Sequence, residues 1–388
     1  MIMEQIDRLR QLSSQMEFEP AEDAICPQPF RSRRDPDGLN VFQAVLPNGG
    51  HISLLKTVLT SACERNCNYC AFRSGRDFRR IHLSPEEMAH SFMQAHRAGL
   101  VQGLFLSSGV AGGGRRSQDN LIATVEILRK RYRFTGYIHL KLMPGLEYAQ
   151  VERSMQLANR VSVNLESPTL QRLEKLAPKK AFFEELLQPL KWVDEIRKQQ
   201  PAVKGFSGRW PSTTTQFVVG AVDETDLELL STTASLQNEL SLGRAYFSAF
   251  RPVSDTPFED NPPTPPLRQR RLYQASFLLR DYGFDLEDLP FESASGNLPL
   301  QVDPKLAWAR QNLTGNPMEL NRADRCELLR LPGVGPRKAE AILLARRKGL
   351  FHSEAILSSL GLDIPRLSPF ILIDGKQPDR QLSFWPVR

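Results

Sequence analysis

Short apolar runs alternate with amphipathic stretches between residues 50 and 252. The apolar runs have the length expected for buried strands, and the stretches between them repeat apolar positions with helical spacing. Six strands are predicted, over residues 52–59, 101–106, 137–142, 161–165, 213–219 and 244–250. Such β-α repeats predict parallel strands joined by right-handed crossovers. The pattern allows either a partial barrel or an open, doubly wound sheet.

Five helices are predicted between these strands. The first has clear start signals, because Ser84 can act as the N-cap, Pro85 follows it and Glu87 occupies the capping-box position. The other four are expected over residues 120–132, 146–157, 181–199 and 224–240. A glycine run at 112–114 precedes the second helix and is interpreted as a mobile loop.

The ends of the chain have other patterns. A helical stretch at the start places Ile6, Leu9 and Leu12 on one face, within an N-terminal extension over residues 1–48. The barrel or sheet domain is expected over 49–260. The run N-P-P-T-P-P at 261–266 opens a Pro-rich linker with one helix (267–282) that extends to 316. Residues 317–388 form a small, helical last domain.

Composition bounds the class of protein. The chain has 388 residues, of which 41% are hydrophobic and 24% are charged, so it can build a sizeable core. It contains no run of 18 apolar residues, and its first residues lack the apolar segment of a secretory signal. With only five cysteines, a disulfide framework is excluded. We therefore expect a protein of the reducing cytoplasm, without a membrane span.

Three of the five cysteines follow the first predicted strand in the run T-S-A-C-E-R-N-C-N-Y-C. Cys63, Cys67 and Cys70 have the spacing C-x3-C-x2-C, which suits three corners of a cubane iron–sulfur cluster and leaves the fourth iron open to another ligand. The alternatives are a structural zinc site and three unrelated cysteines. Zinc would require four ligands, and neither His51 nor His82 has zinc-finger spacing.

This cysteine loop, with the aromatic Tyr69 before the last cysteine, resembles the signature of the radical S-adenosylmethionine (radical SAM) enzymes. The resemblance implies an α/β fold, a partial (β/α)6 TIM-like barrel. It also implies a [4Fe–4S] cluster on the three cysteines, with SAM chelated at the open iron and cleaved to a 5′-deoxyadenosyl radical. An electron donor such as flavodoxin or ferredoxin would supply the reducing electron.

The active sites of barrels lie at the carboxyl ends of the strands, so the polar and glycine residues there are candidates for SAM binding. Ser107, Ser108 and Gly109 loosely resemble the segment of the family that accepts the SAM amino group, although the glutamate of that segment is absent. The other candidates lie after later strands; they are Lys141 for the SAM carboxylate, Asn164 and Glu166 for the ribose or methionine, and Gly220 beside the adenine. Each has a purely structural alternative.

Two cysteines lie outside the loop. Cys26 is a candidate hydrogen donor to a substrate radical, although a free structural thiol is the favoured interpretation. Cys326 falls on a predicted helix of the last domain, where we expect it to pack against the core.

The run L-R-L-P-G-V-G-P-R-K at 329–338 is the second strong motif. Two helices flank a turn in which Gly333 and Gly335 permit unusual backbone angles and Val334 can enter the core, so that backbone N–H groups are presented to an anion. The run closely resembles the helix-hairpin-helix module, a DNA-backbone binder, which implies DNA contacts from Arg337 and Lys338. A second hairpin, expected near Gly361, is degenerate. The alternative is a hairpin used only for packing or protein contacts.

Charge agrees with this interpretation. Residues 317–388 hold 12 Lys and Arg against 8 Asp and Glu, which is four of the six net positive charges of the chain. The two motifs together resemble a bacterial group of radical SAM proteins of DNA modification or repair. The resemblance implies an enzyme acting on DNA, with a repair protein as a possible partner. The alternatives are a radical SAM enzyme of RNA or tRNA, and a non-catalytic iron–sulfur protein that binds DNA or joins a repair complex.

Overall fold

The computed structural model describes residues 2–18, 33–34, 39–45 and 50–378. The chain forms two compact units. The barrel unit contains residues 1–224 and 235–269, and the C-terminal unit contains residues 225–234 and 270–388. The units do not follow the predicted domain limits. The Pro-rich run belongs to the barrel unit, and the rest of the expected linker lies in one unit with the expected last domain.

One eight-stranded sheet forms the centre of the barrel unit, and its strands neighbour one another in chain order. The first two strands are antiparallel additions, and all pairings from β3 to β8 are parallel. The strands are β1 (Arg33–Arg34), β2 (Asn40–Val45), β3 (His51–Val58), β4 (Gly103–Ser107), β5 (Tyr137–Lys141), β6 (Arg160–Glu166), β7 (Ser212–Val219) and β8 (Arg244–Ala249). The six predicted parallel strands are confirmed.

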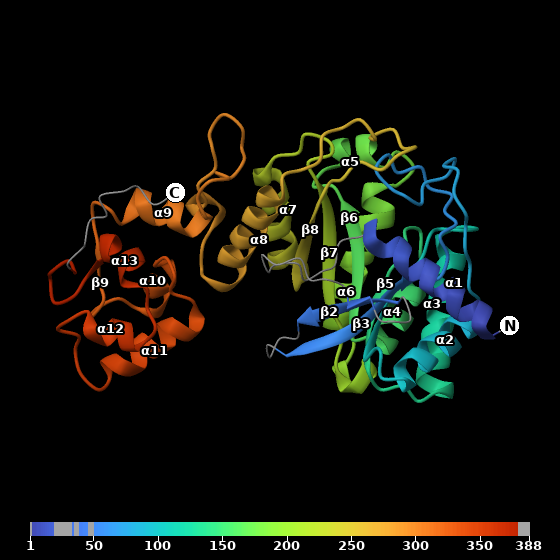
Figure 1. Ribbon diagram of the computed structural model, residues 1–388, viewed down its shortest axis with the longest axis horizontal. Coiled ribbons are helices and arrows are strands. Elements are labelled where there is room, and N and C mark those ends of the chain that lie inside the picture. Colours follow the sequence, from blue (N-terminus) through green and yellow to red (C-terminus); the bar gives the residue numbers. More distant parts are fainter. Residues whose placement is uncertain (1, 19–32, 35–38, 46–49, 379–388) are drawn as a thin grey trace. The chain divides into compact units, whose positions relative to one another are not determined.

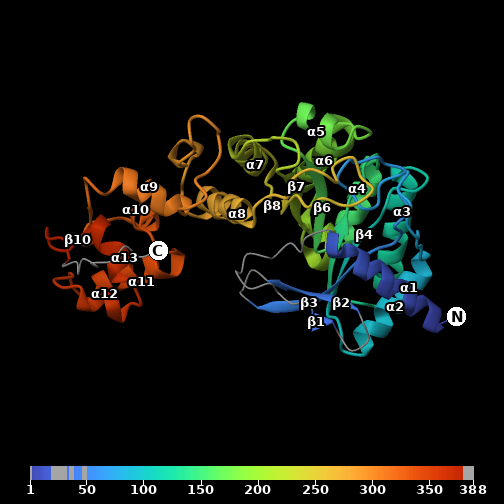
Figure 2. The ribbon, with the colours of Figure 1, turned by 45° about the horizontal axis from the view of Figure 1, so that its top comes forward.

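The strand order decides between the two architectures that the sequence pattern allowed. A doubly wound sheet reverses its strand order at a switch point. Here β3 to β8 follow one another without a reversal, and the sheet curls into half of a barrel (Figure 2). The fold of this unit is therefore the predicted partial barrel.

Helices connect the parallel strands and lie outside the curled sheet (Figure 1). In chain order they are α2 (Pro85–Arg97), α3 (Gly114–Glu126) with η2 (Ile127–Arg131), α4 (Tyr148–Leu157), α5 (Leu170–Leu176), η3 (Phe182–Leu187) with α6 (Gln188–Gln199), η4 (Ala202–Lys204), η5 (Phe206–Gly208) and α7 (Asp226–Leu240). The predicted capping box of α2 is confirmed, because Ser84 Oγ accepts from Glu87 N at 3.2 Å and Ser84 N donates to the Glu87 carboxylate at 2.8 Å.

Gly112 and Gly113 form part of a loop, as predicted, but Gly114 belongs to α3, which begins earlier than the sequence predicts. Gly113 caps the helix with φ +91°, and α3 begins at Gly114 rather than at residue 120. A Cβ on Gly114 would lie 1.8 Å from the carbonyl oxygen of Pro144, so only glycine permits this approach. The prediction failed because that contact joins two loops that are distant in the sequence.

The N-terminal residues pack on the barrel. α1 (Ile2–Ser14) buries Leu9 and Leu12, as its sequence pattern predicts, and is followed by η1 (Gln15–Phe18). Arg8 of α1 forms a 2.7 Å ion pair with Glu87 of α2. Since β2 also pairs with β3, the described parts of the expected extension complete the sheet and cover part of it.

The C-terminal unit is mostly helical. Its elements are α8 (Pro266–Asp281), η6 (Leu286–Asp288), α9 (Pro304–Asn312), α10 (Arg325–Arg330), α11 (Pro336–Arg346), α12 (Ala355–Ser359), α13 (Ile364–Leu367) and η7 (Ser368–Phe370), with a short parallel pair of β9 (Met318–Glu319) and β10 (Ile371–Leu372). The unit boundary falls within α8, after Gln269. None of the helices in the described part of the chain has the length and apolar character required to span a lipid bilayer.

A half-buried ion pair ties the expected linker to the expected last domain. Arg330 of α10 donates to both carboxylate oxygens of Asp288 at 2.9 Å, and Trp308 Nε1 donates to the same carboxylate at 3.2 Å. The Arg330 guanidinium also lies over the rings of Phe284 and Trp308. Hydrogen bonds from Arg330 lower the pKa of Asp288. These contacts explain why residues 270–316 and 317–388 form one unit.

Lys305 of α9 gives this unit a pH-dependent stability. Its ammonium is buried, donates to the carbonyl oxygen of Val334 at 2.6 Å and lies over the ring of Tyr282. Burial lowers the pKa of Lys305 to about 7. The unfolded chain therefore binds one more proton between about pH 7 and pH 10, and the free energy of unfolding should rise with pH there by at most about 1.4 kcal/mol per unit. Urea denaturation of the full chain, followed by tryptophan fluorescence, measures this rise.

The matched control for that measurement is an exposed lysine of the same unit. Lys305→Met should lose the rise with pH, and Lys348→Met should keep it, because Lys348 is exposed. An identical pH dependence in wild type and Lys305→Met would contradict the assignment.

Candidate active site

A cavity of about 500 Å³ opens at the carboxyl ends of the parallel strands of the barrel unit. Every one of these strands contributes a lining residue at or near its end. They are Val58 of β3, Ser107 of β4, Lys141 of β5, Asn164 and Glu166 of β6, Gln216 and Val218 of β7, and Ser248 of β8. In α/β barrels this edge carries the chemistry, because side chains from different strands converge there.

The loop after β3 brings Cys63, Cys67 and Cys70 to the same cavity. Backbone hydrogen bonds fix the loop, including Glu64 N to Val110 O at 2.8 Å and Cys70 N to Cys67 O at 3.3 Å. Cys67 is buried, with 6% of its surface exposed. Burial raises the pKa of the Cys67 and Cys70 thiols, so their deprotonation requires a compensating positive charge.

Arg80 holds the backbone before and after the three cysteines of the loop. Its guanidinium donates to four backbone carbonyl oxygens, at 2.7–3.2 Å, and lies 3.8 Å from the centre of the Phe78 ring. The four carbonyls belong to Ser61, Phe72, Arg73 and Arg76. One side chain thus organises residues on both sides of the three cysteines.

Gly109 is one of the candidate residues that the sequence predicted after the second parallel strand, and the structure explains why a glycine occurs there. A Cβ at this position would lie 2.1 Å from the carbonyl oxygen of Ala62, next to Cys63. Gly109 N also donates to Thr60 O at 2.7 Å. The glycine is required because the cysteine loop passes directly over it. Ser107 and Ser108 line the cavity beside it, and the Ser108 hydroxyl donates to Gly109 O at 2.8 Å.

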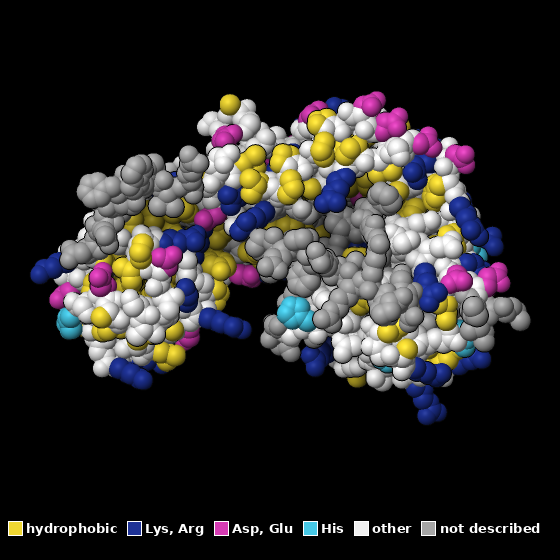
Figure 3. All heavy atoms as spheres, in the orientation of Figure 1, with side chains coloured by type: hydrophobic (Ala, Val, Ile, Leu, Met, Phe, Trp, Pro, Cys, Tyr) yellow, Lys and Arg dark blue, Asp and Glu magenta, His cyan; other side chains and the backbone are white. Residues whose placement is uncertain are grey.

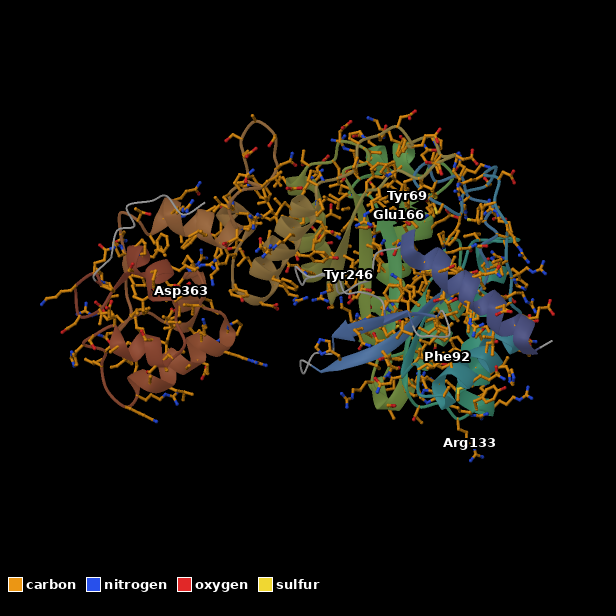
Figure 4. All side chains as sticks on the ribbon, in the orientation of Figure 1. Tyr69, Phe92, Arg133, Glu166, Tyr246 and Asp363 are labelled. Carbon is orange, nitrogen blue, oxygen red and sulfur yellow. The ribbon has the colours of Figure 1, made fainter. Side chains whose placement is uncertain are left out.

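Glu166 ends β6 and is held by two partners inside the protein. Its carboxylate accepts from the Tyr69 hydroxyl at 2.8 Å and from the Lys180 ammonium at 2.7 Å. Figure 4 labels Tyr69 and Glu166, which lie beside each other. Only 4% of the Glu166 side chain and 10% of the Lys180 side chain are exposed. Burial opposes the charge of Lys180, but the charges of Cys67 and Glu166 outweigh it and raise the pKa of Lys180. Burial, with the charge of Glu166 beside it, raises the pKa of Tyr69 well above its usual range, so Tyr69 is a neutral donor.

Most residues predicted from the sequence meet at this cavity. Its lining includes Tyr69, Lys141, Asn164 and Glu166 together with the serines and Gly109. Gly220 does not line it. A Cβ on Gly220, whose φ is +85°, would lie 2.0 Å from Thr264 Oγ1, so this glycine permits close packing of the Pro-rich run on the end of β7. The buried carboxylate of Glu224 accepts from the N–H groups of Gly220 and Val222 in the same turn.

Of the two cysteines outside the loop, the structure describes one. Cys26 lies outside the described residues. Cys326 is exposed on α10, and the expectation that it packs against the core is wrong. The core side of this short helix is supplied by Leu328 and Leu329. The helical period therefore turns Cys326 toward solvent.

Sequence reasoning missed several residues of the cavity. Lys180 follows α5, and Gln15 comes from the N-terminal segment. Gln216 and Gln269 add amide groups, with Gln269 Nε2 donating to Phe247 O at 2.6 Å. No local motif marks these positions. The alternation of β7 could have identified Gln216, because it is a polar residue within an otherwise buried strand.

Residues 57–205 match the sequence model of the Radical SAM superfamily. This match covers β3 to α6 with the cysteine loop at its start. Residues 57–205 therefore carry the sequence of a radical SAM domain. Proteins of this superfamily are enzymes that use a [4Fe–4S] cluster and SAM.

Solved structures of radical SAM proteins resemble this chain in part. The chain is 13% identical to methylornithine synthase (PylB), with 72% of this chain and 68% of that chain covered and a TM-score of 0.46. It is 17% identical to the FeFe-hydrogenase maturase HydG from Carboxydothermus hydrogenoformans, with 58% and 51% covered and a TM-score of 0.45. The chain spans about half the length of the HydG chains that it matches. No curated protein sequence matches it.

The residues of the radical SAM domain fit this cluster. Cys63, Cys67 and Cys70 supply three thiols from one loop to one cavity, and they are the residues that would hold it. Among the described residues no three His, Cys, Asp or Glu side chains gather closely enough to coordinate a single ion. A cubane binds each thiolate through a different iron atom and does not need that convergence. When bound, the cluster and SAM supply one-electron cleavage of SAM and hydrogen-atom abstraction.

The other residues of the cavity suit two tasks, which are binding a molecule and excluding water. The half-buried Asn164 and Gln216 present amide donors and acceptors to a bound molecule, and buried Lys141 adds a positive charge. The apolar lining, which includes Val58, Val163 and Val218, keeps water away from a reactive site.

Proposed function

We propose that this radical SAM enzyme reductively cleaves SAM and acts on DNA, in modification or repair, and that its C-terminal unit binds the DNA backbone through a helix-hairpin-helix. One observation carries the proposal. A cavity lined by three cluster-type cysteines and a turn shaped for phosphate occur on the same chain.

The geometry of the turn between α10 and α11 supports the proposal. Gly333 is exposed with φ +79°, while the side chain of Val334 is buried with 1% exposed. Gly335 is the N-cap of α11, and no side chain caps the first turn of this 11-residue helix. Helix N-termini with free N–H groups favour anions, and a turn of this kind brings backbone close to a phosphate.

The basic residues of the C-terminal unit agree with this proposal. Arg337 is exposed and Lys338 is half-buried in the first turn of α11, beside the free N–H groups. Lys and Arg side chains project at several points of the face of this unit that Figure 3 shows. Contacts of this kind give affinity that depends on salt and is independent of base sequence.

An external one-electron donor belongs to the proposal. Three of the five cysteines of the chain are committed to the cluster, and the remaining two are too few to ligate a second cubane. We therefore propose that the reducing electron comes from another protein. A flavodoxin or a ferredoxin is the class that we propose.

Anaerobic turnover tests the proposed activity. Wild-type protein with a reconstituted cluster, reductant, SAM and a mixed pool of duplex and single-stranded DNA should form 5′-deoxyadenosine and change the nucleoside composition of the DNA. Mass spectrometry of the digested nucleosides measures that change, and Cys67→Ala serves as the inactive control. Suppose that 5′-deoxyadenosine forms at a rate that DNA does not alter, while tRNA alters it. The DNA part of the proposal is then wrong and the radical SAM part stands.

A further inference from the structure

We propose that Lys180 is a positioning residue that raises the reduction potential of the cluster, and that Glu166 holds Lys180 in place and moderates its charge. This inference concerns the cluster of the radical SAM domain. It holds whatever the substrate is, so it is independent of the DNA part of the proposed function.

The end of β6 is built to present the Glu166 carboxylate inward. The pairing of β6 with β7 shifts register between Val163 and Glu166, and Glu166 has φ +66°. A glutamate in this backbone region is strained, so surrounding contacts must hold it there. Its two oxygens have one partner each, Lys180 on Oε1 and Tyr69 on Oε2. A buried carboxylate that lost either partner would be left poorly compensated.

The segment that carries Lys180 is fastened to the cysteine loop. Asn68 donates to two carbonyl oxygens at the end of α5, through its backbone N–H to Leu176 O and through its amide to Lys175 O, both at 2.8 Å. Lys179 N donates to Asn66 Oδ1 at 3.2 Å. Arg65 bridges the same segments, since it donates to Lys179 O and pairs with Glu185 at 2.5 Å. These contacts hold residues 175–180 against residues 65–69, so the backbone that carries Lys180 lies beside the cysteine loop.

Lys180 and Glu166 line the same cavity as the three cysteines. Lys180 carries the positive charge of their ion pair and Glu166 the negative charge, so the two act on a cluster in that cavity with opposite sign. Arg80 is a second cation near the loop, on the side of Cys63, but its hydrogen bonds go to backbone carbonyls. Lys180 is a buried cation whose ion-pair partner, Glu166, is a separate side chain, so mutation of each partner can separate their effects.

A fixed positive charge beside a cluster favours the state with one more electron. Reduction adds a negative charge to the cluster and its thiolates, and in a poorly solvated site the attraction to a nearby ammonium is only weakly screened. Removing Lys180 should therefore lower the reduction potential. Removing the charge of Glu166 while keeping its shape should raise it, because the ammonium then acts without its counter-charge. Opposite shifts from two partners of one ion pair are not expected from a purely structural role.

The test is a potentiometric titration of the full chain with a reconstituted cluster, without SAM, followed by electron paramagnetic resonance. Lys180→Gln should disfavour reduction at least tenfold, which is about 59 mV for one electron. Glu166→Gln should shift the potential upward, and the double variant should return close to wild type. Lys179→Gln is the matched control, because its exposed side chain is the neighbour of Lys180 and should leave the potential unchanged. Iron content is measured for every variant.

Several outcomes would overturn the proposal. Lys180→Gln with full iron content and a wild-type or raised potential would do so, and so would equal shifts in the control. If Lys180→Gln does not retain a cluster, its potential cannot be measured, and Lys180→Arg should restore both the cluster and the wild-type potential. The direction of the shift in Glu166→Gln then decides whether the proposal holds. A potential in Glu166→Gln that is equal to or below wild type shows that Lys180 only packs the loop.

Discussion

Replacement of Cys67 with alanine is expected to abolish assembly of the iron–sulfur cluster and to leave the affinity for DNA unchanged. Cys67 is the most buried of the three loop cysteines, and the barrel has no spare thiol beside it among the described residues. Loss of a ligand should exceed the roughly 10–100-fold loss of metal affinity that removal of an outer-shell partner causes. Iron and sulfide analysis after anaerobic reconstitution measures the effect.

The substitution should not disturb the rest of the fold. Alanine fits the space of the thiol, and the hydrogen bonds that hold the loop are made by backbone groups and by side chains other than that of Cys67. Formation of 5′-deoxyadenosine should fall to the background of protein without iron. DNA affinity should persist because the turn at Gly333 belongs to the other unit.

Cys326→Ala is the matched control for this experiment. Cys326 is the exposed cysteine of α10, and its removal should change neither iron content nor turnover. Should Cys67→Ala retain a full complement of iron, the loop would not be the ligand set. Loss of both cluster and DNA binding would instead indicate that the variant is misfolded.

The sequence predicted the elements of the barrel well because their signals are local. Each of the six parallel strands is an apolar run of the right length, and α2 carries its cap in four consecutive residues, 84–87. The cysteine loop was equally clear, since three scarce residues fall within eight positions. Such signals depend only on neighbours in the chain.

Contacts between distant segments account for what the sequence could not predict. Lys180 contacts Glu166 because the segment after α5 packs against the end of β6. The sequence around Lys180 does not distinguish it from its exposed neighbour Lys179. Gly109, Gly114 and Gly220 are glycines because another segment passes over each of them. The sequence shows where a glycine occurs, but it cannot predict which distant atom leaves no space for a side chain there.

The same reason explains the difference in domain limits. The prolines at 261–266 predict an extended segment, but Thr264 within that run is buried and donates to Val219 O at 2.6 Å. Further on, the ion pair between Asp288 and Arg330 joins residues that are 42 positions apart. The composition of residues 261–316 predicted a linker. In the structure, tertiary hydrogen bonds hold these residues within the two packed units.

Substitution of both turn glycines, Gly333→Val with Gly335→Val, is expected to weaken DNA binding at least tenfold while the cluster forms normally. Valine at Gly333 would have to adopt φ +79°, which a β-branched residue strongly disfavours. A Cβ on Gly335 would lie 3.3 Å from the Tyr282 hydroxyl, which is a tight contact. The backbone N–H groups at the start of α11 would no longer face a phosphate. Fluorescence anisotropy with a labelled duplex, at several salt concentrations, measures the loss.

Strain in the turn and general unfolding would both lower the measured DNA affinity. The experiment therefore needs variants that leave the backbone of the turn unchanged. Arg337→Gln and Lys338→Gln keep both glycines, and each should lower the slope of log affinity against log salt by about 1 if its charge contacts a phosphate. Gly349→Val is the matched glycine control, because nothing lies within 4 Å of a Cβ there and its φ is not positive. It should bind DNA like wild type. If the glycine pair loses affinity but neither charge variant changes the salt slope, the turn supports the fold of the unit and does not contact the DNA backbone.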